Sequence, residues 1–253
     1  MKKEISKRLD AIEKREDVRI LYACESGSRA WGFPSADSDY DVRFIYVRPR
    51  EWYLRLDSEA CRDVIEEPIE GVLDINGWDL DKALRLMKKS NPVLMEWLQS
   101  PIVYREEPSF TTGMTDLMIK YCSSVACYHH YSNMARSNFR EHLRGEEVRT
   151  KKYFYVLRPL LAMIWIEKGM GIVPMEFESL VEKALDGGDL KSDIEKLLAD
   201  KRDGLESEKG PRIESINNFI KEELSRLEKS PPELTGRRES FDEINRFFQS
   251  FLE

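Results

Sequence analysis

The pattern of apolar residues changes near residue 106, and this change constrains the fold more than any other feature. Before it, short runs rich in β-branched and aromatic residues, such as 18–23 and 42–47, alternate with short helical patterns. After it, strand-like runs are almost absent and apolar residues recur at helical spacing. We therefore predict an α+β chain, with an α/β domain over residues 1–106 and an all-α helical domain over residues 107–253.

Each predicted domain contains several elements. The clearest element of the first domain is a helix over residues 79–89, because its apolar residues fall on one face of a helix. Glycine and proline pairs separate the helical patterns of the second domain. The expected strands are 18–23, 42–47, 62–68, 71–76 and 102–104, and the expected helices of the second domain are about 115–144, 150–168, 176–186, 189–202, 212–229 and 239–252.

Charge and composition exclude several classes of protein. The formal net charge of -7 argues against a strongly basic nucleic-acid binder, although residues 136–158 form a basic island. The longest clean apolar run, residues 160–166, is far shorter than the roughly 20 residues that cross a bilayer. The charged N-terminus lacks the apolar core of a signal peptide. We expect a cytoplasmic protein with no membrane partner. The four cysteines form no CxxC pair, which argues against a zinc site.

Candidate chemistry is concentrated where two predicted strands begin and end. Gly27-Ser28 follows the first strand, and ten residues later Asp39-x-Asp41 opens the second. Two carboxylates spaced by two on an extended segment emerge on the same face and repel each other. A divalent cation relieves that repulsion, and Mg²⁺ prefers oxygen ligands. The alternative is a helix cap and a solvated acid, but Asp41 leads directly into an apolar strand, where a cap has no use.

A third acid, Asp74, lies within another apolar strand, where an unpaired carboxylate would be costly. Three carboxylates suffice to hold two metal ions around an in-line displacement at phosphorus. Glu66, Glu67 and Glu70 lie nearby and stay open as alternatives to Asp74. Gly27 would let the backbone approach a phosphate closely, and Ser28 could donate to triphosphate oxygens. An ordinary strand-to-helix turn is the competing interpretation of this pair.

The order of these motifs resembles the signature of the DNA polymerase β-like nucleotidyltransferases. More narrowly, several segments resemble the RNA-ligase-associated branch of that superfamily, over roughly residues 18–180. The resemblance implies a polymerase β-like nucleotidyltransferase domain with a mixed sheet, and a reaction that uses a metal ion and an NTP. The segments that carry it are 27–32, 38–46, 74–80, 91–92, 96–98 and 151–159.

The resemblance and the spacing together define a set of candidate site residues. In the superfamily a basic helix often closes over the triphosphate, and Lys151, Tyr155 and Arg158 share one helix face. A solvated basic face is the alternative there, and Arg29 could equally pair with a surface acid. The catalytic and metal-binding candidates, for Mg²⁺ or Mn²⁺, are Asp39, Asp41 and Asp74, and the nucleotide-binding candidates are Gly27, Ser28, Arg29, Ser38, Lys152, Tyr155 and Arg158.

The function that these residues indicate is a metal-dependent transfer of a nucleoside monophosphate from an NTP donor to an acceptor hydroxyl, with release of pyrophosphate. The family association favours an RNA end as the acceptor, while small molecules such as aminoglycosides and protein side chains stay open. A different class is a nucleotide-binding regulatory or toxin–antitoxin-type partner that keeps the fold with little turnover. The sequence leaves the base preference and the oligomeric state open.

Overall fold

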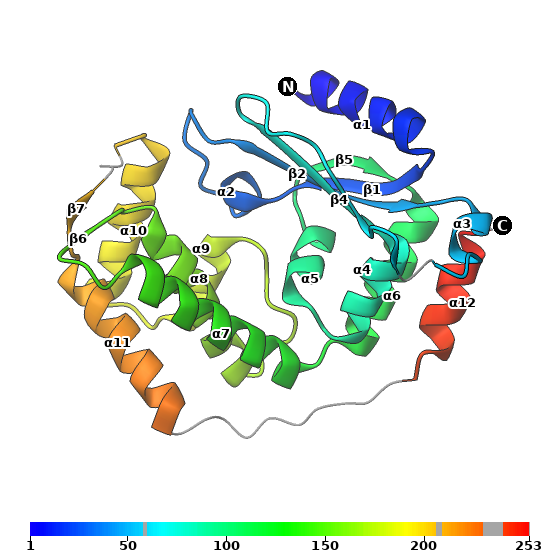
Figure 1. Ribbon diagram of the computed structural model, residues 1–253. Helices are drawn as coiled ribbons and strands as arrows, with labels where there is room; N and C mark the ends of the chain where they lie inside the picture. The colour runs from blue at the N-terminus through cyan, green and yellow to red at the C-terminus, as the bar shows by residue number, and fades with distance from the viewer. Residues whose placement is uncertain (58–59, 206–208, 230–239, 253) are drawn as a thin grey trace. The chain divides into compact units, whose positions relative to one another are not determined.

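The computed structural model describes residues 1–57, 60–205, 209–229 and 240–252 (Figure 1). The chain divides into two compact units. The first contains the sheet and the second is built mainly from helices. The first unit is formed by Met1–Ala30, Asp39–Cys122 and Arg237–Glu253, and the second by Trp31–Ser38 and Ser123–Gly236.

The first unit is organised around a five-stranded mixed sheet, which confirms the α+β class. The strand order is β3-β4-β2-β1-β5. Strands β2 and β4 are parallel, whereas the other neighbouring strands are antiparallel. The parallel pair brings the starts of β2 and β4 to the same end of the sheet. The strands are β1 (Arg19–Glu25), β2 (Tyr40–Val47), β3 (Val64–Glu66), β4 (Leu73–Asp79) and β5 (Val103–Glu106).

Helices of the first unit cover both faces of this sheet (Figure 1). Helix α1 (Lys2–Glu16) turns Ile5, Leu9 and Ile12 inward, and these residues join the apolar side chains of one sheet face in a single core cluster. That periodicity is why this segment forms an amphipathic helix. The other face is covered by α4 (Leu80–Lys88), α5 (Pro92–Leu98) and α6 (Pro108–Tyr121), and the unit also includes α2 (Gly27–Ala30), α3 (Arg50–Tyr53) and α12 (Asp242–Ser250).

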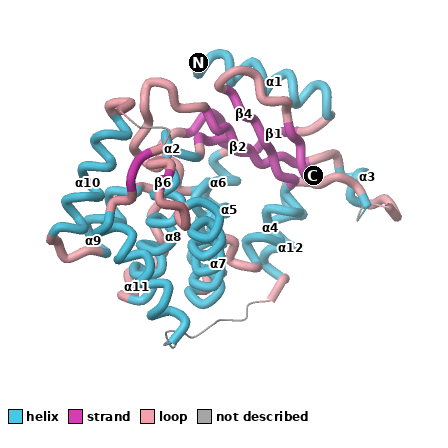
Figure 2. The backbone as a smooth tube through the Cα atoms, turned by 60° about the vertical axis from the view of Figure 1, so that its left-hand side comes forward, coloured by secondary structure: helices cyan, strands magenta, loops and turns pink. Residues whose placement is uncertain are grey.

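The second unit surrounds one buried helix, α8 (Lys152–Glu167), as can be followed in Figure 2. Most side chains of α8 are buried, so it is the core of this unit and not a surface helix. A two-stranded ribbon of β6 (Glu147–Val148) and β7 (Gly210–Pro211) closes one end. The other helices are α7 (Ser124–His142), α9 (Phe177–Ala184), α10 (Asp189–Arg202) and α11 (Glu214–Lys229).

The compact units differ from a division at residue 106. Helix α6 belongs to the sheet unit, because Phe110 and its apolar neighbours are buried there. Helix α12 returns to the same unit, where the Phe110 ring lies 5.9 Å from Phe247 and 5.6 Å from Phe251. The single helix expected over 115–144 is wrong. The chain is extended at Cys122, and the Ser123 hydroxyl caps a new helix by accepting from Ala126 N.

A short segment between the two motifs, Trp31–Ser38, belongs to the helical unit. The Phe33 ring stacks on Phe154 with 4.5 Å between centroids. The backbone N–H of Phe177 donates to Trp31 O at 3.0 Å. The Lys201 ammonium donates to Ser35 Oγ at 3.0 Å. The chain therefore leaves the sheet unit directly after the Gly-Ser turn and returns to it at Asp39.

Across the described parts of the chain, no helix is both long enough and apolar enough to cross a membrane.

Candidate functional site

The Gly-Ser turn and the Asp-x-Asp motif meet in space. Ser26 N donates to Asp41 O at 2.8 Å. Gly27 has a φ of 60°, and a Cβ atom added there would lie 2.1 Å from Asp41 Oδ2. Only glycine satisfies both conditions, since the conformation is left-handed and the carboxylate occupies the space of a side chain. The two motifs that the sequence separates by ten residues thus form one site.

Asp41 and Asp74 are direct neighbours in the sheet. They are Cα partners in the parallel register of β2 and β4. Their side chains are 29% and 32% exposed, so solvent screens them only in part. The guanidinium of Arg43 lies between them, with Nη2 3.2 Å from Asp41 Oδ1 and 2.7 Å from Asp74 Oδ2. The structure therefore brings these two predicted carboxylates together around a positive charge.

The competing acids near Asp74 have other partners. Glu66 pairs with Arg62, Glu67 with Arg15 and Glu70 with Arg8. None of these three glutamates is the register partner of Asp41, whereas Asp74 is. Of these four acids, Asp74 is therefore the one that lies beside Asp41 in the sheet.

Asp39 precedes β2 and is exposed. Its backbone oxygen accepts a hydrogen bond from Arg29 Nε at 3.0 Å. The Arg29 guanidinium also lies 3.8 Å from the centroid of the Tyr40 ring. A cation on an aromatic face is favourable. Arg29, which the sequence assigned to the nucleotide, therefore fixes the backbone on the approach to β2.

The electrostatics of the site favour a cation. Burial raises the pKa of the Asp41 carboxyl, Arg43 opposes this rise, and the negative charges of Asp74 and Asp39 add to it. Among the residues that the structure describes, no group of three or more His, Cys, Asp or Glu side chains is arranged to hold a metal ion. Asp41 and Asp74 already share a cationic nitrogen, however. Two carboxylates that share a cation fit a hard divalent ion such as Mg²⁺.

Glu25 is a site residue that the sequence analysis missed. It is fully buried, and its Oε1 accepts from Asp41 N at 2.7 Å, while the Tyr104 hydroxyl donates to Oε2. The Ser100 hydroxyl donates to Glu25 O at 2.6 Å. Burial raises the pKa of Glu25, and the two donors to its carboxylate oppose this rise. A lone acid that ends an apolar strand was a visible signal, because such a group must find donors.

Arg43 was missed as well. It follows Asp41 by two residues, so its side chain emerges on the same face of β2. The same period-two argument that pairs Asp39 with Asp41 extends to Arg43. Its two acidic neighbours come from different strands, however, and only the β2–β4 register places Asp74 beside it.

Ser28 and Ser38 have different surroundings. Ser28 lies in the short helix α2 and is half-buried. Ser38 is 9% exposed, and its hydroxyl lies 2.9 Å from both the backbone nitrogen and the hydroxyl of Ser35. The Ser38 hydroxyl therefore closes the turn that leads to Asp39.

The candidates on α8 lie in the helical unit. The Lys152 ammonium is 4.7 Å from the centroid of the Tyr155 ring, and Tyr155 is 39% exposed. Arg158 is only 2% exposed and donates to Met175 O at 3.2 Å. Its guanidinium also lies 5.1 Å from the centroid of the Trp31 ring. Arg158 is therefore buried inside the helical unit. It does not belong to an exposed polar face of α8, as the sequence had predicted.

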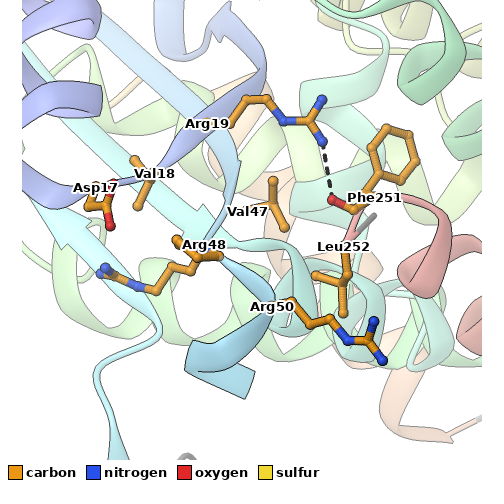
Figure 3. Close-up of a pocket in the computed structure, with 9 residues that line it drawn as sticks. Asp17, Val18, Arg19, Val47, Arg48, Arg50, Phe251 and Leu252 are labelled. Atoms are coloured by element: carbon orange, nitrogen blue, oxygen red, sulfur yellow. Dashed lines mark hydrogen bonds between the residues drawn. The ribbon is translucent and has the colours of Figure 1, made fainter. Parts of the chain in front are cut away.

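A cavity of about 380 Å³ lies at the other end of β1 and β2 (Figure 3). Three arginines line it, but their guanidinium groups point in different directions. Arg19 donates to Phe251 O at 3.1 Å. Because the cationic groups do not converge, this cavity is not a second charged site of the kind formed by Asp41 and Asp74. Its lining residues are Asp17, Val18, Arg19, Val47, Arg48, Pro49, Arg50, Phe251 and Leu252.

Known proteins resemble this chain over its whole length. The profile of the RNA repair pathway DNA polymerase beta family (RlaP) matches residues 1–250. The chain is also 49% identical over 256 residues to the uncharacterized protein YcgL of Bacillus subtilis (strain 168), a match that covers 100% of this chain and 97% of that protein. The match spans both units and every residue of the site. The chain therefore belongs to the RNA repair pathway DNA polymerase beta family, within the polymerase β-like nucleotidyltransferase superfamily.

Proposed function

We propose that the chain transfers a nucleoside monophosphate from an NTP to an acceptor hydroxyl in a metal-dependent reaction. One observation carries the proposal. The Asp41 carboxylate faces Asp74 in the sheet and at the same time packs against Gly27. A carboxylate pair that packs directly against a glycine backbone can hold a cation and a phosphate in contact with each other.

The candidate residues have separate roles in binding the metal ion and the triphosphate. Asp39 and Asp41 would hold the ion that accompanies the triphosphate, and Asp74 would complete a second site. When bound, a Mg²⁺ or Mn²⁺ ion supplies positive charge that polarises the α-phosphate and stabilises the leaving pyrophosphate. The backbone at Gly27 and the Ser28 hydroxyl bind the β- and γ-phosphates.

Bond making and breaking occur at the α-phosphorus. The acceptor oxygen forms a bond to this phosphorus while the bond to the bridging oxygen of the β-phosphate breaks, and pyrophosphate leaves. We assign Asp74 to accept the proton of the acceptor hydroxyl, because its carboxylate is partly exposed and lies beside Asp41. Glu25 holds the Asp41 backbone in place through its Oε1 atom.

The test measures pyrophosphate release from labelled NTPs with Mg²⁺ or Mn²⁺. We expect release by the wild type and a loss of at least about 100-fold in Asp41→Asn. Asp37→Asn is the matched control, because Asp37 is an exposed acid in the preceding turn. Release that persists in an Asp39→Ala/Asp41→Ala double variant would show that the assignment is wrong.

An unsuitable acceptor would give no pyrophosphate release in that assay. The Mn²⁺-dependent binding of an NTP is therefore measured as well. Binding that is equal in the wild type and in Asp41→Asn contradicts the proposal. Binding without turnover, together with a stoichiometric protein partner in a pull-down, favours the regulatory alternative.

An RNA end is the acceptor that we propose. The name of the family refers to an RNA repair pathway. The helical unit also has exposed basic residues near β6. Binding of tRNA is measured across a range of salt concentrations. We expect the affinity to fall steeply with salt, because phosphate contacts release counterions, and to fall by about threefold in an Arg144→Ala/Arg149→Ala variant. An affinity that is insensitive to both changes favours a small-molecule acceptor.

A further inference from the structure

The side chain of Arg43 is held by four acceptors around the carboxylate pair. Nη2 contacts Asp41 Oδ1 and Asp74 Oδ2, as described above. Nη1 donates to Val42 O at 3.0 Å and to Asp74 O at 3.2 Å. The side chain is 18% exposed. A guanidinium fixed by four oxygens on two strands is a built element of the site and not a passing surface ion pair.

The positive charge of Arg43 lies between the negative charges of Asp41 and Asp74. Asp41 and Asp74 are register partners in parallel strands and are both partly shielded from water. Without Arg43, the two carboxylates would repel each other at short range in a medium of reduced dielectric. Arg43 therefore stabilises the arrangement of the pair before any other cation arrives.

A divalent ion at this site would be held by the same two carboxylates that bind Arg43. Asp41 Oδ1 and Asp74 Oδ2 both bind Arg43 Nη2, so an ion that bridges the two carboxylates through these atoms displaces the guanidinium. An ion that uses the other oxygens still lies within a few ångströms of a positive charge. In either case Arg43 opposes metal binding by Coulomb repulsion.

We infer that Arg43 is an internal cation that holds Asp41 and Asp74 together in the metal-free protein and competes with the metal for them. This inference rests on the metal-binding part of the proposed function. It makes Arg43 a positioning residue whose loss has two effects of opposite sign. The metal-free protein becomes less stable, while its affinity for a divalent ion increases.

The experiment compares Arg43→Gln with a matched variant, Arg105→Gln. Arg105 also bridges two acids, Asp10 and Glu13, and is 24% exposed, but it lies away from Asp41. The melting temperature is measured in EDTA and in Mn²⁺. The dissociation constant for Mn²⁺ is measured by calorimetric titration without nucleotide.

We expect Arg43→Gln to melt about 3 °C lower in EDTA and to bind Mn²⁺ about tenfold more tightly than the wild type. Added Mn²⁺ then restores the melting temperature. Arg105→Gln is expected to lose the same stability in EDTA and in Mn²⁺, with its Mn²⁺ affinity unchanged. Arg43→Lys keeps the positive charge but not the planar guanidinium with its forked donors. Its Mn²⁺ affinity should therefore lie between those of the wild type and Arg43→Gln.

Weaker or absent Mn²⁺ binding in both Arg43 variants overturns the inference, and so does a stability loss that Mn²⁺ does not restore. Because these readouts contain no nucleotide, they are separate from the pyrophosphate assay. If the wild type releases pyrophosphate while Arg43→Gln binds Mn²⁺ more weakly than the wild type does, the inference about Arg43 is refuted and the proposed function is not. Mn²⁺ binding that survives in an Asp41→Asn/Asp74→Asn variant refutes the metal assignment itself.

Discussion

At the scale of single residues, the site depends on how closely Gly27 and Asp41 approach. The carboxylate of Asp41 fills the position that a side chain at residue 27 would take. The backbone N–H of Asp41 is fixed in turn by buried Glu25. Both contacts act on the same aspartate, so substitutions on either side of it should disturb the same chemistry.

Gly27→Ala should abolish activity, because the added methyl displaces the Asp41 carboxylate. The left-handed backbone adds a cost of about 1–2 kcal/mol to the free energy of folding. Gly71→Ala is the matched control. Gly71 has a φ of 61°, nearly equal to that of Gly27, but nothing lies within 4 Å of an added Cβ atom. Stability from chemical denaturation should fall in both variants, and pyrophosphate release should fall only in Gly27→Ala. Equal activity in the two variants would contradict the role of the close approach.

Glu25→Ala should reduce both stability and activity, because it leaves partly buried donors of Asp41 and Tyr104 without their acceptor. A loss of about 2 kcal/mol in the free energy of unfolding is expected, together with a loss in kcat of about 10-fold or more. Glu25→Gln keeps an acceptor oxygen for Asp41 N and should retain most of the activity. Urea denaturation and steady-state kinetics measure the two effects. A Gln variant as inactive as the Ala variant would show that the negative charge matters more than the position of Asp41.

At the scale of elements, helix α4 starts at a buried acid. The Asp79 carboxylate accepts from Asp81 N at the helix start and from the Tyr53 hydroxyl, and Asp79 is 4% exposed. Burial raises the pKa of Asp79 from 3.8 to about 6. The sequence places this helix correctly, since its apolar stripe and capping acid are local signals.

The raised pKa of Asp79 predicts a dependence of stability on pH. The unfolded chain ionises this carboxyl at lower pH than the folded protein, so ionisation favours unfolding between about pH 4 and pH 6. Asp79 should therefore cost up to about 3 kcal/mol above pH 6 and nothing below pH 4. Asp79→Asn should gain stability relative to the wild type as pH rises through this window, in urea denaturation at several pH values. Asp116→Asn, which removes an exposed acid from α6 of the same unit, controls for a general charge effect. A difference between Asp79→Asn and the wild type that does not grow with pH would refute the assignment.

The elements also show how far sequence reasoning reaches. Strands and amphipathic helices were found because their periodicity is local. The break at Cys122 was missed, because both flanking segments are helical and only Ser123 marks the new start. Asp41 and Asp74 were predicted as site residues from strand context. The contacts that Glu25 and Arg43 make with these acids depend on the register of β1, β2 and β4, which is not visible in the sequence. The burial of Arg158 depends on the segment before α9, which spacing along α8 cannot reveal.

At the scale of the whole molecule, the chain passes between its two units four times. The segment Trp31–Ser38 is held in the helical unit by the Phe33 stack and by a hydrogen bond from Arg202 to Gly32 O at 2.8 Å. Gly27 and Asp39 are therefore each joined to that unit by only a few residues. Neither unit is a continuous stretch of the sequence, which explains why the pattern of apolar residues indicated only one seam, near residue 106.

A fragment of residues 1–106 should consequently fail to fold cooperatively. It lacks α6 and α12, the two later helices of the sheet unit, and Phe33 loses the rings of Phe154 and Phe177. Thermal unfolding followed by circular dichroism should show no sharp transition for the fragment alone. Co-expression with residues 107–253 should restore a transition if the two pieces associate. A sharp transition of the isolated fragment would instead support an independent domain that ends near residue 106.

Helix α12 has a consequence for synthesis on the ribosome. The sheet begins with β1 near the N-terminus, yet Phe247 in α12 and Phe251 directly after it pack on Phe110. At ordinary elongation rates these residues emerge roughly 10–50 s after the first strand. Until then, Phe110 lacks the two rings that pack on it in the folded protein. The sheet unit, although it is the first to be started, is completed only after the whole helical unit has been synthesised.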